Sequence, residues 1–63
     1  MCLSTVYKNT KTPEAIVMKN VMALECRDGM VILTDLMERT MAIEGTLEMA
    51  NLGEGYVIVK EAE

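Results

Sequence analysis

The chain has 63 residues, of which 51% are hydrophobic, and its formal net charge is −4. This length allows one domain, residues 1–63, that buries only about 60% of its unfolded surface, and the hydrophobic content argues against disorder. Six scattered basic residues and two tyrosines are too few for a nucleic-acid surface, which must neutralise phosphates and stack bases.

The sequence contains no apolar run of the roughly 18 residues that span a membrane, and its beginning lacks the pattern of a signal peptide. We therefore expect a cytoplasmic protein whose two thiols, Cys2 and Cys26, stay reduced. Without a disulfide framework, a chain this short needs another source of stability. We expect that source to be a partner subunit.

The first twenty residues begin with a predicted strand. Residues 2–8 contain a threonine, a valine and a tyrosine in succession, which favour extended structure. Residues 9–14 are polar and include the only proline, so they predict a loop. Residues 15–18 are too short to distinguish a strand from a first helical turn, and residues 19–20 indicate a turn.

A hairpin is the clearest feature of the middle of the chain. Residues 21–27 form a β-prone run, Asp28-Gly29 follows, and residues 30–34 return. The Asp-Gly pair suits a type I′ turn, which needs positive φ at both central residues. Apolar residues run almost continuously along both arms, so we expect both faces of the hairpin to be covered.

The second half of the chain supplies the remaining strands. Residues 40–44 read as a strand, Gly45 is expected to kink or bulge it, and residues 46–51 fit either more strand or one helical turn. A glycine-containing turn at residues 53–55 precedes the last strand, residues 56–60, which has three β-branched residues in succession.

Together these segments predict an all-β fold. Five or six short antiparallel strands with turns at about 8–12-residue spacing are typical of a small barrel or sandwich. Closing a barrel removes exposed strand edges, and the usual closure brings the first and last strands together. We therefore expect Val6 and Tyr7 to pair near Val57 and Val59, with the amino terminus beside the rim.

Apolar side chains within these segments are assigned to the core. Methionine adapts to irregular gaps, and Cys26 shares a strand face with Met22 and Leu24. The core residues expected in addition to the β-branched ones are Met18, Met22, Cys26, Met41, Leu47, Met49 and Leu52. No methionine cluster has the short, fixed spacing of a copper site.

No arrangement of residues indicates catalysis, and we expect the protein not to be an enzyme. The chain has no histidine, whereas nucleophilic catalysis needs a positioned base beside the nucleophile. The acidic residues, Asp35 included, are typical of a solvated surface. Asp35 and Glu38 near a loop offer only a weak and common pattern for a cation.

The set of ligands that best suits a metal belongs to Met1 and Cys2. The terminal amine, the Cys2 amide nitrogen and the Cys2 thiolate would form two fused five-membered chelate rings around one ion. Planar nitrogen and sulphur donors favour nickel(II) or copper(II), whereas zinc prefers a tetrahedral site with more side-chain ligands. The alternative is that Cys2 is a small apolar residue at the end of the core.

This donor set is incomplete, because one chain supplies three donors at most. A two-fold dimer would bring two Cys2 thiolates to one ion, since an isologous interface repeats the same group across its axis. Alternatively, each terminus binds its own ion with a loose fourth ligand, which suits a carrier that releases its metal. If Met1 is removed, the Cys2 amine and thiolate make a single chelate ring.

The sequence also resembles a known family of proteins. The segments that carry the resemblance are Met1–Tyr7, Val21–Leu24, Asp28-Gly29 with Met30–Leu33, Thr34–Leu36 and Tyr56–Val59. They resemble the CooT family of small nickel-binding proteins, some of which carry the older label of predicted RNA-binding protein. The resemblance spans essentially the whole chain, and its most specific part is the Met-Cys start.

The resemblance implies properties that composition and spacing do not show. Members are homodimers of a small SH3-like or Sm-like β-barrel and bind nickel(II) through the amino-terminal cysteine, here Cys2. The founding member is tied to nickel insertion into carbon monoxide dehydrogenase. The resemblance therefore implies a homodimeric nickel metallochaperone or carrier, whose partner is a nickel enzyme or a maturation protein. The alternative function is a Sm-like module that binds RNA or protein without using Cys2.

Overall fold

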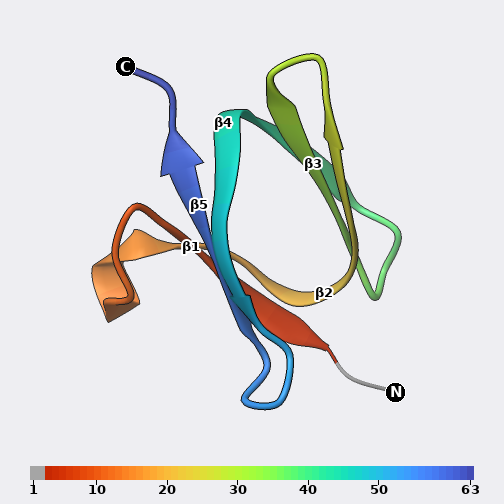
Figure 1. The fold of residues 1–63 in the computed structure, drawn as a ribbon. Helices are drawn as coiled ribbons and strands as arrows, with labels where there is room; N and C mark the ends of the chain where they lie inside the picture. Colours follow the sequence, from red (N-terminus) through yellow and green to blue (C-terminus); the bar gives the residue numbers. More distant parts are fainter. Residues whose placement is uncertain (1–2) are drawn as a thin grey trace.

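A computed structural model describes residues 3–63 as five strands that form a closed barrel (Figure 1). The elements in chain order are β1 (Ser4–Lys8), the 3-10 helix η1 (Pro13–Ala15), β2 (Ile16–Arg27), β3 (Met30–Asp35), β4 (Thr40–Asn51) and β5 (Tyr56–Glu61). Each strand pairs with the next, and β5 pairs with β1. The prediction of a small all-β barrel is confirmed.

The barrel closes through the two strands that the sequence predicts. Val6 of β1 lies opposite Val57 of β5, and Lys8 lies opposite Val59. This closing pair is parallel, whereas the other four pairs are antiparallel. The difference follows from the strand number, because in a ring of five alternating strands the first and the last must point the same way.

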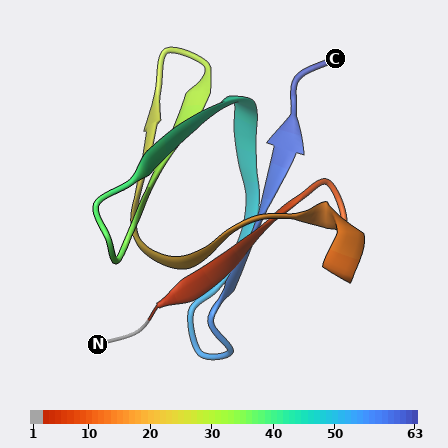
Figure 2. The ribbon, with the colours of Figure 1, turned by 180° about the vertical axis from the view of Figure 1, so that it is seen from behind.

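Two long strands, β2 and β4, form the corners of the barrel. β2 pairs with β1 as far as Val21 and with β3 from Val21 onward. β4 pairs with β3 as far as Glu44 and with β5 from Gly45 onward. Figures 1 and 2 show both strands curving from one half of the barrel to the other. The segments predicted on either side of residue 45 are therefore one strand, and residues 46–51 are not helical.

The two bends have different local causes. Asn20 has a left-handed backbone (φ 57°), a conformation that asparagine tolerates, and the pairing register of β2 shifts beside it. The turn predicted at residues 19–20 is therefore wrong, since β2 bends there without ending. At the corner of β4, a Cβ atom on Gly45 would collide with the Lys60 carbonyl oxygen. Glycine allows β5 to approach this closely.

The predicted hairpin is confirmed. Asp28 and Gly29 both have positive φ, 55° and 75°, and they connect β2 to β3. Within the hairpin, Leu24 lies opposite Leu33 and Cys26 lies opposite Val31.

Every strand contributes to the core. Its members within residues 3–63 are Val6, Val21, Val31, Leu33, Ile43, Val57 and Val59. Six of these seven are β-branched, a side-chain shape that packs well on a pleated surface. Full burial of such a side chain stabilises the folded state by about 1.5–3 kcal/mol.

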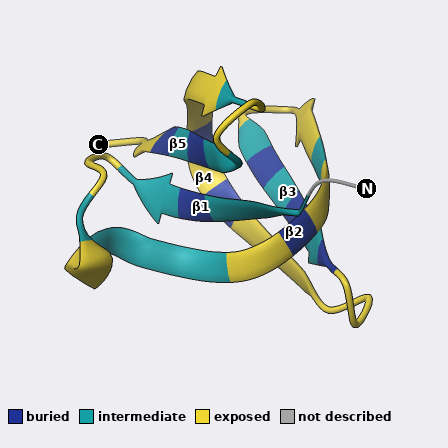
Figure 3. Ribbon diagram, turned by 90° about the horizontal axis from the view of Figure 1, so that it is seen from below, coloured by how far each residue is buried: buried dark blue, intermediate teal, exposed yellow. Residues whose placement is uncertain are grey.

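Most of the other apolar residues assigned to the core are exposed, and their assignment is wrong. Met22, Met41, Leu47, Met49 and Leu52 are 39% to 68% exposed, and Cys26 is also exposed. Met18 alone of that set packs against the core. Register shifts beside Met22 and between Leu47 and Met49 break the simple alternation of faces on which the assignment depended. Figure 3 shows the resulting exposed stretches along β2 and β4.

Core packing can be tested by shortening one side chain in the interior and one outside it. Leu33 is fully buried, so Leu33→Ala should lower the free energy of unfolding by about 2–5 kcal/mol. Leu47 is 41% exposed, so Leu47→Ala should lower it by less than about 1 kcal/mol. Urea denaturation measures both values. Equal losses in the two variants would contradict the assigned core.

Candidate functional site

Cys2, the predicted metal ligand, lies outside the described residues, but the segment that follows it is held on both sides. Ser4 of β1 lies opposite Val21 of β2, and the Thr5 N–H donates a hydrogen bond of 3.0 Å to the Gly55 carbonyl oxygen. Gly55 has φ 80°, and a Cβ atom there would lie 3.3 Å from the Leu3 carbonyl oxygen. The chain next to Cys2 is therefore fixed to β2 and to the β4–β5 turn.

An apolar groove of about 370 Å³ opens beside the beginning of β1. Its lining consists of Ser4, the segment 21–24 of β2, Leu52 and Val57. Leu52, at the β4–β5 turn, is 68% exposed, although a leucine side chain gains free energy by leaving water. The groove is therefore an uncovered apolar surface, and its lining includes Ser4, which follows Cys2 by two positions in the sequence.

The β3–β4 turn carries two more exposed apolar side chains. The Leu36 N–H donates a 2.9 Å hydrogen bond to the Asn20 carbonyl oxygen, which places the turn next to the bend of β2. Leu36 and Met37 are both exposed. With Met22 and Leu52 they make four of the seven large exposed apolar residues in the described part of the chain. We call these four the apolar rim.

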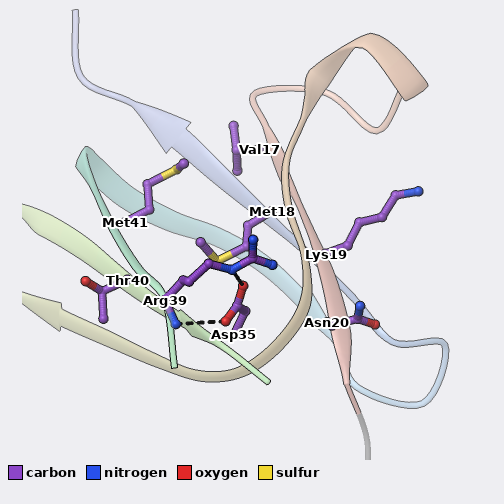
Figure 4. A pocket seen from close by; sticks show the side chains of 8 residues that line it. All are labelled: Val17, Met18, Lys19, Asn20, Asp35, Arg39, Thr40 and Met41. Carbon is purple, nitrogen blue, oxygen red and sulfur yellow. Dashed lines mark hydrogen bonds and ion pairs between the residues drawn. The ribbon is translucent and has the colours of Figure 1, made fainter. Parts of the chain in front are cut away.

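A buried carboxylate, Asp35, holds the β3–β4 turn in place. One carboxylate oxygen, Oδ1, accepts hydrogen bonds of 2.9 Å from the N–H groups of Met37 and Arg39. The other, Oδ2, accepts a 2.8 Å bond from Arg39 Nε (Figure 4). Asp35 is only 2% exposed, so it is not the solvated surface residue that the sequence suggested.

Burial raises the pKa of Asp35, but the Arg39 N–H, the Arg39 guanidinium and the Met37 N–H together outweigh this effect and hold the pKa below its ordinary value. Both oxygens are engaged by these donors, so Asp35 and Glu38 do not form an open cation site. Across residues 3–63, no group of three or more histidine, cysteine, aspartate or glutamate side chains gathers as a metal would need.

Cys26 is far from the beginning of β1 along the sheet. It lies five residues beyond Val21, the partner of Ser4, which corresponds to about 16 Å of extended strand. The fold therefore does not bring this second thiol to the start of β1.

The two tyrosines of the chain pack against each other. The rings of Tyr7 and Tyr56 meet edge to face, with centroids 6.3 Å apart. The Lys11 ammonium lies 4.5 Å from the centroid of the Tyr56 ring, which suits a cation–π contact.

Sequence reasoning missed both the Asp35 network and the apolar rim. A signal for the first was present, because an aspartate directly after an apolar strand often accepts hydrogen bonds from main-chain N–H groups of the following turn. The rim gave only a partial signal: Leu36, Met37 and Leu52 are apolar residues in turns, whereas Met22 lies in a strand, where the sequence pattern does not separate a core-facing from a solvent-facing residue.

Comparison with known proteins gives a family match. A family model described as CO dehydrogenase accessory protein CooT matches residues 1–60. The match includes Cys2 and all five strands except Glu61, the last residue of β5. No curated protein matches the chain. Among residues 3–63, no helix is long and apolar enough to cross a membrane.

The Asp35 network predicts a specific loss of stability in acid. The pKa is lower in the folded state, so the stabilisation is complete above the unfolded value near 3.8 and is lost as the pH falls through the folded value. The wild-type Tm should therefore fall as the pH drops below about 4 toward the folded pKa. Asp35→Asn should flatten this part of the profile and lower the Tm at neutral pH by at least about 5 °C.

Thermal melts followed by circular dichroism measure both effects. Glu38→Gln is the matched control, because Glu38 is an exposed carboxylate on the same turn. If Asp35→Asn kept the full wild-type slope in acid, the network would not be the origin of the pH dependence.

Proposed function

Because the chain belongs to the CooT family of CO dehydrogenase accessory proteins, we propose that it is a carrier of nickel(II) for carbon monoxide dehydrogenase and binds the metal through Cys2. The observation that carries the proposal is the family match over residues 1–60 together with a thiol at position 2. Carbon monoxide dehydrogenase is a nickel enzyme, so a protein accessory to it has a reason to handle this metal.

The donors of the first two residues suit nickel as a cargo. An amine, an amide nitrogen and a thiolate on consecutive short links favour tetragonal nickel(II). The thiolate and the amide nitrogen must lose their protons, so affinity should rise with pH. No histidine is available in the sequence to complete the set. An incomplete donor set is an advantage for a carrier, because the metal must leave for the client.

Two features of the described residues support this role for Cys2. The chain is anchored directly after it, through the pairing of Ser4 with Val21 and the hydrogen bond from Thr5 to Gly55. An anchored neighbour lowers the entropy that the ligands lose when they bind. The other thiol, Cys26, lies near the far end of β2 and does not compete for the same ion.

We further propose that the carrier is a homodimer whose interface includes the apolar rim. Large exposed apolar side chains in a small domain indicate an interaction surface. A two-fold interface over the rim would cover Met22, Leu36, Met37 and Leu52, and a two-fold axis repeats every residue, Cys2 included. Two thiolates could then share one ion. The partner that receives the metal would be the client enzyme or a maturation protein.

The remaining parts of the proposal concern chemistry and location. A carrier binds and releases its cargo without catalysis, so the protein is not expected to be an enzyme. A cytoplasmic location fits a thiol that must stay reduced in order to bind nickel.

Calorimetric titration of nickel(II) into the metal-free protein tests the role of Cys2. Loss of an outer-shell contact weakens metal binding roughly 10–100-fold, and loss of a direct ligand in Cys2→Ser should weaken it more than that. The thiolate-to-nickel absorption band should also disappear in this variant. Cys26→Ser is the matched control and should bind like the wild type. Equal affinity of Cys2→Ser and wild type would contradict the proposal. Salt-sensitive RNA binding that survives in Cys2→Ser, without nickel binding, would support the Sm-like module instead.

Light scattering at micromolar concentration tests the interface. The wild type should have the mass of a dimer, and Leu52→Asp should shift it to a monomer, because a buried unpaired carboxylate is costly. Met49→Asp is the control, since Met49 is similarly apolar and exposed but does not line the groove. A monomeric wild type would end the dimer proposal and would leave the result for Cys2 unaffected.

A further inference from the structure

A second groove, of about 400 Å³, opens between the first half of β2 and the beginning of β4 (Figure 4). It is lined by residues 17–20, Asp35 and residues 39–41. Figure 4 shows Val17 and Met18 along β2, Met41 on the side of β4, and the Arg39 side chain extending into the space between the two strands. This groove shares no lining residue with the one beside the beginning of β1.

Both strands that flank the groove present an unpaired edge. β2 pairs with β1 from Ile16 to Val21, whereas its pairing with β3 begins only at Val21. β4 pairs with β3 from residue 40, whereas its pairing with β5 begins only at Gly45. Among the five described strands, residues 16–19 and 40–43 therefore have a partner on one side only. Unpaired strand edges are the surface to which extended peptides add as a further strand.

Arg39 supplies a fixed anion-binding group at this edge. Its Nε is held by Asp35 Oδ2 at 2.8 Å, and the side chain is 74% exposed. Within residues 3–63, neither Nη atom makes a hydrogen bond to another side chain. A guanidinium fork binds a carboxylate through two parallel hydrogen bonds. Because Asp35 already fixes the Arg39 side chain, less rotamer entropy is lost when a carboxylate binds.

The other lining residues agree with a peptide that is both acidic and apolar. Lys19 is a second cation on the groove and forms no ion pair within the described chain, although it points away from Arg39. Val17, Met18 and Met41 contribute apolar side chains to the lining of the groove. Neither tyrosine lines the groove, so a nucleic-acid base would find no ring to stack on.

We propose that this groove binds an extended acidic segment of a partner protein. The backbone of the segment pairs with the free edge of β2 at residues 16–19. One of its carboxylates binds the Nη atoms of Arg39, and a neighbouring apolar side chain contacts Met18 and Met41. The proposal goes beyond metal carriage, since this groove would select a protein partner whether or not nickel is bound.

The test is a titration of the ¹⁵N-labelled full chain with a synthetic octapeptide of alternating glutamate and valine, followed by NMR. Amide shifts should be concentrated in residues 16–20 and 39–41, and a lysine–valine octapeptide should cause none. Arg39→Lys keeps the charge but loses the fork, so it should weaken binding about tenfold. Arg27→Lys is the matched control, because Arg27 pairs with Glu25 on the distant hairpin, and should bind like the wild type.

Three results would overturn the proposal: amide shifts elsewhere on the barrel, equal binding of the two octapeptides, or equal affinity of Arg39→Lys and wild type. The same shifts produced by an oligouridine, and not by the acidic peptide, would overturn it in favour of a nucleic-acid surface. If Arg39→Lys does not fold, Lys19→Gln replaces it and should weaken binding about threefold; unchanged affinity in that variant overturns the proposal.

The peptide titration is independent of the metal proposal. Cys2→Ser should bind the acidic octapeptide as the wild type does. Loss of nickel binding in that variant, with peptide binding retained, separates the two functions. Peptide binding that fails in a protein that binds nickel normally removes only the groove proposal.

Discussion

The account depends on the pairing of β1 with two neighbours at once. β1 has only five residues, yet it lies between β2 and β5 and closes the barrel. The hydrogen bond from Thr5 to Gly55 extends that hold to the first residues of the strand. A chain that buries so little surface has few other ways to fix its beginning. The chain directly after position 2 is therefore paired with a neighbouring strand on each side.

The two proposed binding surfaces involve two different grooves of the barrel. The groove that Met22 and Leu52 line opens beside the beginning of β1, and the groove with Arg39 lies between the free edges of β2 and β4. Asp35 connects the two regions, because it holds the turn that carries Leu36 and Met37 and also fixes the Arg39 guanidinium. A buried charge that accepts three hydrogen bonds is costly to lose, so this one residue stabilises the geometry of both surfaces.

The sequence predicted the fold better than it predicted the surface. Strand propensity, the Asp28-Gly29 turn and the closing pair of Val6 with Val57 followed from local patterns. The bends of β2 and β4 did not, because they depend on tertiary pairing that shifts the register. Those shifts expose Met22 and Met49, which alternation alone assigned to the core. The metal site was predicted from the donor atoms at Cys2. The family match supports an accessory role for the protein.

The central claim is that sulphur from Cys2 binds nickel(II). X-ray absorption at the nickel K-edge of the loaded protein tests it most directly, because sulphur and light-atom neighbours scatter differently. The account predicts a nickel–sulphur shell together with nitrogen neighbours in a planar arrangement, and loss of the sulphur shell in Cys2→Ser. A spectrum of the wild-type protein with only oxygen and nitrogen neighbours would contradict it.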